Sequence, residues 1–150
     1  MNLKLEASIM NKSELKECTN LMVKVFSSEP WFDKWESIEH AANYLKEFMD
    51  NPVFIGFVIR KNDNIVGACF GHTRSWYEGK EYYIDEYFID NDLQSGGVGS
   101  KLMNYIKEYV ASKSIHCITL ITKKDVLARK FYEKHGFKCN EDNIFMYNIF

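Results

Sequence analysis

The chain has 150 residues, of which 46% are hydrophobic and 27% charged, and its net charge at pH 7 is −2. This length and composition are typical of one globular domain over residues 1–150, which can bury its core without disulfides or a structural metal. The balanced charge argues against a general nucleic-acid-binding protein, because such proteins need a concentrated basic surface. The sequence therefore favours a globular domain with no nucleic-acid partner.

The sequence carries no pattern typical of secretion or of a membrane span. Residues 1–6 already include an acid and lack the apolar run of a secretory signal. The longest apolar stretch, residues 53–59, is far too short to cross a bilayer. The four cysteines are far apart and form no Cys-x-x-Cys pair, so we expect reduced thiols. We predict a cytoplasmic protein without membrane contact.

Charge is distributed unevenly along the chain. Residues 29–92 hold thirteen acids and six bases, a net of −7, whereas residues 93–138 hold nine bases and three acids, a net of +6. This asymmetry suits two ligands of opposite sign, an anionic one held by the C-terminal half and a cationic one by the N-terminal half. Scattered solvated charge is the alternative interpretation.

Hydrophobic spacing and turn residues predict the secondary structure in chain order. In the first half we expect a strand at 3–10, helices at about 12–26 and 38–49, and strands at 53–60 and 65–76 joined as a hairpin. In the second half we expect a strand at 81–90, a glycine-rich loop, a helix from 98 to about 110, a strand at 117–122, a helix at 126–134 and a terminal strand at 144–150. This order predicts a mixed α/β sheet covered by helices.

The glycine-rich loop reads Gln-Ser-Gly-Gly-Val-Gly-Ser and lies between a predicted strand and a predicted helix. Glycines allow a ligand to approach the backbone, and the unpaired amides at a helix N-terminus attract anions such as a diphosphate. The loop has no Gly-Lys-Ser/Thr of a P-loop, and Leu102 stands where the Rossmann fingerprint needs its third glycine. A flexible turn without a ligand is the alternative.

A second motif, about thirty residues after the glycine-rich loop, favours one interpretation of that loop. Residues 128–137 read Ala-Arg-Lys-Phe-Tyr-Glu-Lys-His-Gly-Phe. Together with Gln94-x-x-Gly97-x-Gly99, this segment closely resembles the GNAT family of acyl-CoA-dependent N-acetyltransferases. The resemblance covers nearly the whole chain. It implies a mostly antiparallel, twisted sheet of about seven strands flanked by about four helices, acetyl-CoA as cosubstrate, no metal, and an amine acceptor, and it leaves a homodimer open.

The resemblance also implies roles for individual residues. Tyr132 would protonate the departing thiolate, and main-chain groups at Phe88 and Ile89 would pair with the pantetheine arm as an added strand would. Asp125 stands where the family often has Asn, which puts one contact to the pantetheine in doubt. The residues expected to hold the diphosphate are Gln94, Ser95, Gly96, Gly97, Val98, Gly99 and Ser100.

An amine attacks a thioester only when neutral, so the site needs a proton acceptor. Asp85 and Glu86 are the candidates, and strand alternation places them on opposite faces unless a bulge intervenes. We prefer Asp85, because its separation from Gln94 is similar to that of the catalytic Asp in some aminoglycoside acetyltransferases and because Tyr83 and Tyr87 would share its face. Proton removal through water, without a dedicated base, stays open.

Aromatic residues beside carboxylates suggest where a cationic acceptor binds. Trp31, Phe32 and Trp35 occupy the region between the first two helices, which forms part of the acceptor pocket in the family, and simple coverage of the sheet is the alternative. The four histidines are isolated in the sequence and predict no metal site. Two other classes stay open: a non-catalytic acyl-CoA sensor on the same fold, and a protein that binds NAD or ATP through the glycine loop.

Overall fold

A computed structural model describes residues 4–29, 31–124 and 126–150 of the chain. Its single sheet has five strands in sequence order, and all neighbours are antiparallel except the last pair, which is parallel. The strands are β1 (Leu5–Ile9), β2 (Phe54–Lys61), β3 (Asn64–Trp76), β4 (Gly79–Ile89) and β5 (Cys117–Leu120).

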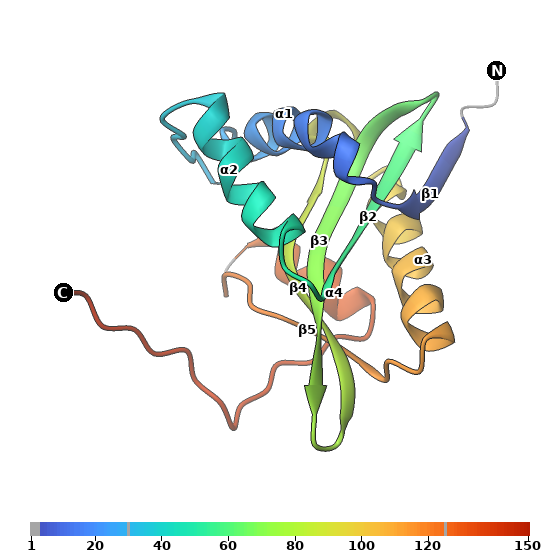
Figure 1. Cartoon of the computed structure of the whole chain (residues 1–150), viewed down its shortest axis with the longest axis vertical. Helices are drawn as coiled ribbons and strands as arrows, with labels where there is room; N and C mark the ends of the chain where they lie inside the picture. The colour runs from blue at the N-terminus through green and yellow to red at the C-terminus, as the bar shows by residue number, and fades with distance from the viewer. Residues whose placement is uncertain (1–3, 30, 125) are drawn as a thin grey trace.

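Helices cover both faces of this sheet (Figure 1). They are α1 (Leu15–Phe26), α2 (Ile38–Met49), α3 (Val98–Ser112) and α4 (Leu127–Lys134). Single-turn 3-10 helices, Lys12–Glu14 and Asn91–Leu93, precede α1 and the glycine loop. No helix among the described residues is long and apolar enough to cross a membrane.

Two hydrophobic cores form, one on each face of the sheet. On one face, α1 and α2 pack on the sheet through residues such as Met22, Leu45 and Phe70, all 1% exposed or less. On the other face, α3 packs through Leu102 and Ile106, and Tyr132 of α4 joins this core. Apolar residues at helical spacing give each helix one buried side, so burial of these sides holds the helices on the sheet.

The structure confirms the mixed α/β architecture and the four helices. The expectation of about seven strands was wrong, because the structure has five among its described residues. The terminal strand expected at 144–150 is also absent, since these residues form no regular structure. A strand needs a neighbour to satisfy its backbone groups, and this segment runs away from the sheet (Figure 1). The first expected strand, 3–10, begins outside the described residues.

Candidate active site

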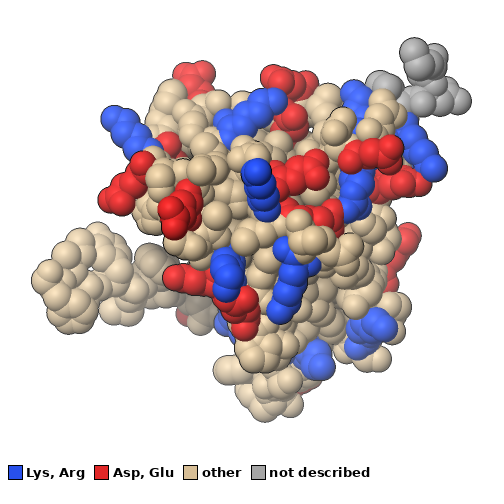
Figure 2. All heavy atoms as spheres, turned by 45° about the horizontal axis from the view of Figure 1, so that its top comes forward, with Lys and Arg blue, Asp and Glu red and all other residues tan. Residues whose placement is uncertain are grey.

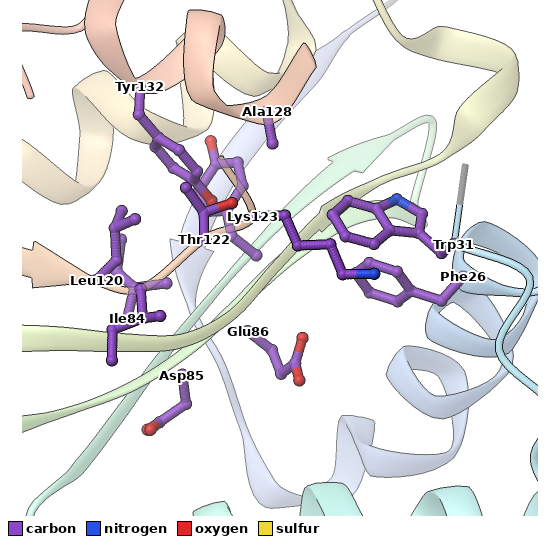
Figure 3. A pocket seen from close by; sticks show the side chains of 12 residues that line it. Phe26, Trp31, Ile84, Asp85, Glu86, Leu120, Thr122, Lys123, Ala128 and Tyr132 are labelled. Carbon is purple, nitrogen blue, oxygen red and sulfur yellow. The ribbon is translucent and has the colours of Figure 1, made fainter. Parts of the chain in front are cut away.

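The site begins where β4 and β5 separate. The two strands pair only over Glu81–Ile84 and Cys117–Leu120, so β4 continues from Asp85 to Ile89 without a neighbour on its β5 side among the described residues. Unpaired main-chain groups at such an edge can accept an extended ligand as an additional strand. The opening is lined by residues of β4, of α4 and of the segment after β5 (Figure 3).

The glycine-rich loop leads directly into α3. Gly97 is the N-cap residue of this helix, with φ of 85°, a left-handed conformation that favours glycine. A Cβ built on Gly97 would meet no atom within 4 Å, so its surroundings are open to a ligand. No side chain caps α3. Its first amides therefore face the loop and form a suitable site for an anion.

A cavity of about 430 Å³ extends from this loop to α4. Of the loop residues predicted to hold a diphosphate, five line it: Gln94, Ser95, Gly97, Gly99 and Ser100. The other two do not. The amide of Gly96 donates to the Leu93 carbonyl, and the side chain of Val98 is buried in the core. Asp125 lies outside the described residues.

Phe88 and Ile89, whose main-chain groups are predicted to pair with a pantetheine arm, also line this cavity. The Gln94 side chain donates a hydrogen bond to the Ile89 carbonyl at 3.1 Å. This hydrogen bond occupies the Ile89 carbonyl and ties the glycine-rich loop to the end of β4. Ser100 contacts the ring of His135 at 2.9 Å, which links the start of α3 to the end of α4.

A second cavity, of about 320 Å³, lies between β4 and the segment after β5. It is lined by Asp85 and Glu86, among other residues. The two cavities share five lining residues: Phe26, Trp31, Tyr87, Ala128 and Tyr132. A ligand in one cavity can therefore reach a ligand in the other.

Asp85 is an extra residue in β4. Glu86 pairs with Phe70 of β3 and Ile84 pairs with Gly71, so Asp85 has no partner and forms a bulge. The bulge reverses the alternation of side chains. Tyr82 and Ile84 before it, and Tyr87 and Ile89 after it, belong to the α3 side, whereas Phe88 belongs to the α1 and α2 side. The strand alternation expected from the sequence was therefore wrong across this point.

This correction separates Tyr83 from Tyr87. Tyr83 pairs with His72 of β3, lies under the Arg74 guanidinium at 4.1 Å, and lines neither cavity. Tyr87 lines both cavities, and its hydroxyl donates to the Gly99 carbonyl. The expected aromatic pair around Asp85 does not form.

The side chains of Asp85 and Glu86 point in different directions (Figure 3) and have different hydrogen-bond partners. The Asp85 carboxylate lies 2.8 Å from Nδ1 of His72. Glu86 instead accepts a hydrogen bond from the Tyr44 hydroxyl of α2. Burial raises the pKa of Glu86 above its usual value; the Tyr44 hydrogen bond opposes this rise, and the nearby charges of Asp33 and Asp85 add to it.

Tyr132 lies on α4 and lines both cavities. Its side chain is 9% exposed and packs against Tyr87, Phe131 and Phe137. Burial raises the pKa of this phenol, and the negative charges of Cys69 and Glu86, when ionised, raise it further. The phenol therefore keeps its proton at neutral pH and can act as an acid.

The aromatic residues after α1 are only partly gathered at the site. Trp31 lines both cavities, and the Lys123 amine lies 5.2 Å from the centre of its ring. Phe32 is 58% exposed and lines neither cavity. Trp35 packs on His40 and Tyr44 instead, and its indole nitrogen is buried without a hydrogen-bond partner.

Sequence reasoning missed Tyr44, His72 and Lys123. The first two contact the acidic pair from α2 and β3, and neither spacing nor periodicity in one sequence indicates such contacts. Lys123 follows β5 and so lies at the carboxyl end of a parallel strand, a position where ligands commonly bind. That signal was available in the sequence.

The charge asymmetry along the chain does not appear as two separate charged patches on the side of the molecule that Figure 2 presents. Figure 2 shows Lys and Arg interspersed with Asp and Glu on the side that it presents. Ion pairs account for part of this mixing: Lys24 of α1 holds Asp90 and Asp92, at 2.7 and 2.8 Å, and Arg60 of β2 pairs with Glu14. Among the residues that the structure describes, no group of three or more His, Cys, Asp or Glu side chains is arranged to hold a metal ion.

The fold and the site together give two connected cavities, one with free helix amides at its wall and one with carboxylates, and a buried phenol that lines both, which are features that a group-transfer enzyme needs. Comparison with known proteins identifies the family to which this chain belongs. A sequence model described as the acetyltransferase (GNAT) family matches residues 15–137, so the chain belongs to this family and is an N-acetyltransferase. The resemblance predicted from the two motifs is confirmed.

Individual relatives are distant. An uncharacterized N-acetyltransferase, YhfO of Bacillus subtilis (strain 168), is 23% identical over 113 residues, which cover 73% of this chain and 74% of that protein. A possible acetyltransferase from Clostridium difficile 630 is 17% identical with a TM-score of 0.80, covering 99% of both chains. An aminoglycoside acetyltransferase from an uncultured soil metagenomic sample, in complex with sisomicin, is 20% identical with a TM-score of 0.76, covering 97% of this chain and 96% of that one. At these identities the solved structures establish the fold alone.

Proposed function

We propose that this enzyme transfers the acetyl group of acetyl-CoA to a primary amine of a cationic or polar acceptor by direct attack. The observation that carries the proposal is the shared wall of the two cavities, where Tyr87 and Tyr132 face both. One cavity has the loop amides and the open edge of β4 suited to a diphosphate and a pantetheine arm. The other has the carboxylates suited to an ammonium group.

The proton acceptor that we propose is Glu86 rather than Asp85, which the sequence favoured. Asp85 is engaged by His72, whereas Glu86 is held in the cleft by the Tyr44 hydroxyl. A carboxylate whose pKa is raised by burial is a stronger base than an ordinary one. Its negative charge also attracts the ammonium form of the acceptor before the proton is removed.

In this proposal Glu86 acts as the base and Tyr132 as the acid of the acetyl transfer. Glu86 takes a proton from the ammonium group, directly or through one water, and the neutral nitrogen forms a bond to the acetyl carbonyl carbon. As the bond from this carbon to sulfur breaks, the Tyr132 hydroxyl gives its proton to the departing thiolate. The nitrogen, which after the attack carries one proton more than an amide, then gives that proton to the Tyr132 phenolate, directly or through water. Glu86 loses its proton to solvent, so both residues return to their starting states.

Two features support a cationic acceptor. Trp31 presents an aromatic surface at the acceptor cavity, and Asp33 is close enough to Glu86 to influence its pKa. Some proteins of this fold with solved structures are aminoglycoside acetyltransferases, whose substrates are amine-rich cations. A polyamine or a peptide amine fits the same cavity chemistry.

Binding of acetyl-CoA is tested by titration calorimetry with the Gly97→Val variant. We expect the wild-type chain to bind acetyl-CoA and not NAD or ATP, and we expect the variant to lose this binding because its side chain occupies the space in front of the α3 amides. Gly136→Val is the matched control. Gly136 also has positive φ, 90°, with no atom within 4 Å of a built Cβ, but it lines neither cavity. Unchanged acetyl-CoA affinity in a folded Gly97→Val variant would remove the diphosphate assignment.

A further inference from the structure

Lys123 places a positive charge at the cavity that also holds the acidic pair. It follows the end of β5 and lines this cavity together with Asp85 and Glu86. Among the described residues that line the cavity, no other has a basic side chain. The acetyl transfer proposed above uses the charge of Glu86 and does not use that of Lys123.

The Lys123 side chain extends toward the aromatic wall of the cavity. Its amine lies 5.2 Å from the centre of the Trp31 ring, which is within the range of a cation–π contact. Figure 3 shows this side chain pointing toward Trp31 and Phe26, while the Glu86 carboxylate faces the same opening from β4. One group of each charge therefore faces the opening, one from β4 and one from the segment after β5.

These two charged groups do not form an ion pair with each other. Among the described residues, no salt bridge joins Lys123 to Glu86 or to another acid. Glu86 is instead held by the Tyr44 hydroxyl, and Asp85 lies against His72. Lys123 is exposed, so its amine is in contact with solvent. Both the Lys123 amine and the Glu86 carboxylate are therefore available to a ligand in this cavity.

Charge complementarity favours an acceptor that carries charges of both signs. An ammonium group is attracted to Glu86, whereas a second ammonium group near Lys123 is repelled. A carboxylate on the acceptor removes this repulsion and adds an attraction to Lys123. Such a carboxylate can also accept a hydrogen bond from the hydroxyl of Thr122, which lines the same wall. The cavity volume of about 320 Å³ is at the lower end of the range for small-molecule sites, so a small acceptor suits it.

We propose that the acceptor is a small amino acid, a molecule with a primary amine and a carboxylate, whose ammonium group binds at Glu86 and whose carboxylate binds at Lys123. This inference rests on the proposed function, because it assigns the acceptor of the same site. Lys123 is then a specificity-determining residue. It contacts the carboxylate of the acceptor and exchanges no proton, so it affects acceptor binding and not the chemical step.

The first measurement is binding, because binding does not depend on turnover. Calorimetry is carried out on enzyme saturated with CoA, which has no acetyl group to transfer. The probes are amino acids in which one to five carbon atoms separate the amine from the carboxylate. The primary amide of each chain length is the neutral control, and the diamine of each length is the cationic control. We expect at least one amino acid to bind about fivefold or more tightly than its amide and its diamine.

Three variants test whether Lys123 carries this preference. Lys123→Arg keeps the charge and should keep the preference for the amino acid. Lys123→Glu reverses the charge, so the diamine should bind more tightly than the amino acid. Lys124→Glu is the matched control, because Lys124 is the next residue and is also exposed but lines neither cavity. This control should keep the wild-type preference, and all three variants should bind CoA within a few-fold of wild type.

Turnover with acetyl-CoA separates this inference from the proposed function. The preference for the amino acid should appear in KM, with kcat little changed in Lys123→Arg. Absence of binding by every probe, equal binding of amino acid and amide, or a preference that survives Lys123→Glu would overturn the inference. Loss of CoA affinity in Lys123→Glu alone would place Lys123 at the CoA and would also overturn it. A preference that depends on Lys123, without acetylation of any amine, would instead overturn the proposed function and keep Lys123 as a carboxylate-binding residue.

Discussion

Glu86 and Asp85 are adjacent in sequence but differ in their surroundings, and this difference predicts different effects on the pH profile. The buried Glu86 has a raised pKa, so kcat/KM should fall as pH drops through this value and the carboxylate gains a proton. Glu86→Gln should remove this acidic limb and lower kcat by about 10²-fold or more. The measurement is kcat/KM for the amine across the stable pH range.

Asp85→Asn serves as the neighbouring control. If Asp85 only pairs with His72, the acidic limb persists in this variant and the rate changes little. Loss of the limb in Asp85→Asn, with the limb retained in Glu86→Gln, would transfer the role of base to Asp85.

Tyr132 allows a separate test of the acid. Tyr132→Phe keeps the ring and its packing against Phe137 but removes the proton that the thiolate needs. We expect kcat to fall by about 10²-fold or more while the calorimetric affinity for acetyl-CoA stays within a few-fold of wild type. Full turnover in this variant would assign the tyrosine to packing alone.

For single residues, the sequence indicated which residue types belong to the candidate site better than it indicated where their side chains point. The glycine-rich loop was singled out because it lies between a strand and a helix N-terminus, and Gln94 was singled out through the motif that resembles the GNAT family. The partners of the acidic pair, Tyr44 and His72, come from other elements, and one sequence without an alignment holds no record of such contacts. Glu86 ranked second because the separation of Asp85 from Gln94 is similar to that of the catalytic Asp in some aminoglycoside acetyltransferases. In addition, alternation counted without the bulge placed Tyr83 and Tyr87 on the face of Asp85.

At the scale of elements, α2 is expected to tune the base on β4. The Tyr44 hydroxyl stabilises the ionised form of Glu86 through its hydrogen bond and so lowers the pKa of this carboxyl. Tyr44→Phe removes the bond, and the pKa should rise further. The acidic limb of kcat/KM should then move to higher pH, so that activity falls more at pH 6 than at pH 8.5.

Tyr105→Phe is a suitable control for this shift. Tyr105 lies on α3 and packs on Phe57 in the other core, away from the acidic pair. Its variant should keep the wild-type profile. A limb that stays in place in Tyr44→Phe, or moves to lower pH, would contradict the assignment of Glu86 as the titrating group.

Helices were predictable because each buries one face, and the period of 3.6 is visible in the residues. The long strands β2 and β3 were predictable because each is a largely apolar run, buried on both faces, and turn residues join the two. The β4 bulge was not, because one extra residue leaves no mark on composition and shifts the faces only when the partner strand is known. The strand expected at 144–150 has the pattern of a strand but lacks a neighbour in its own chain. The local sequence pattern indicates which secondary structure a segment can form, but it does not indicate where the partner strand lies.

At the scale of the whole molecule, the arrangement follows from the separation of β4 and β5. The acidic bulge lies in β4 and the glycine loop follows the end of that strand, whereas α4 comes about thirty residues later, after β5. The charge counts along the chain indicated two ligands of opposite sign, but local ion pairs mix the charges on the surface in Figure 2. Within the cavities the chemistry does differ, because the first amides of α3 lie at one cavity and the carboxylates of Asp85 and Glu86 line the other.

The most direct test of this account is turnover itself. Purified enzyme is incubated with acetyl-CoA and, in turn, an aminoglycoside, a polyamine and a lysine-containing peptide, and free thiol release is followed together with the mass of the acceptor. The account predicts that at least one amine releases thiol and gains one acetyl group in equal amounts, and that Glu86→Gln slows both. Tight acetyl-CoA binding without amine-dependent thiol release for any of these acceptors would contradict it.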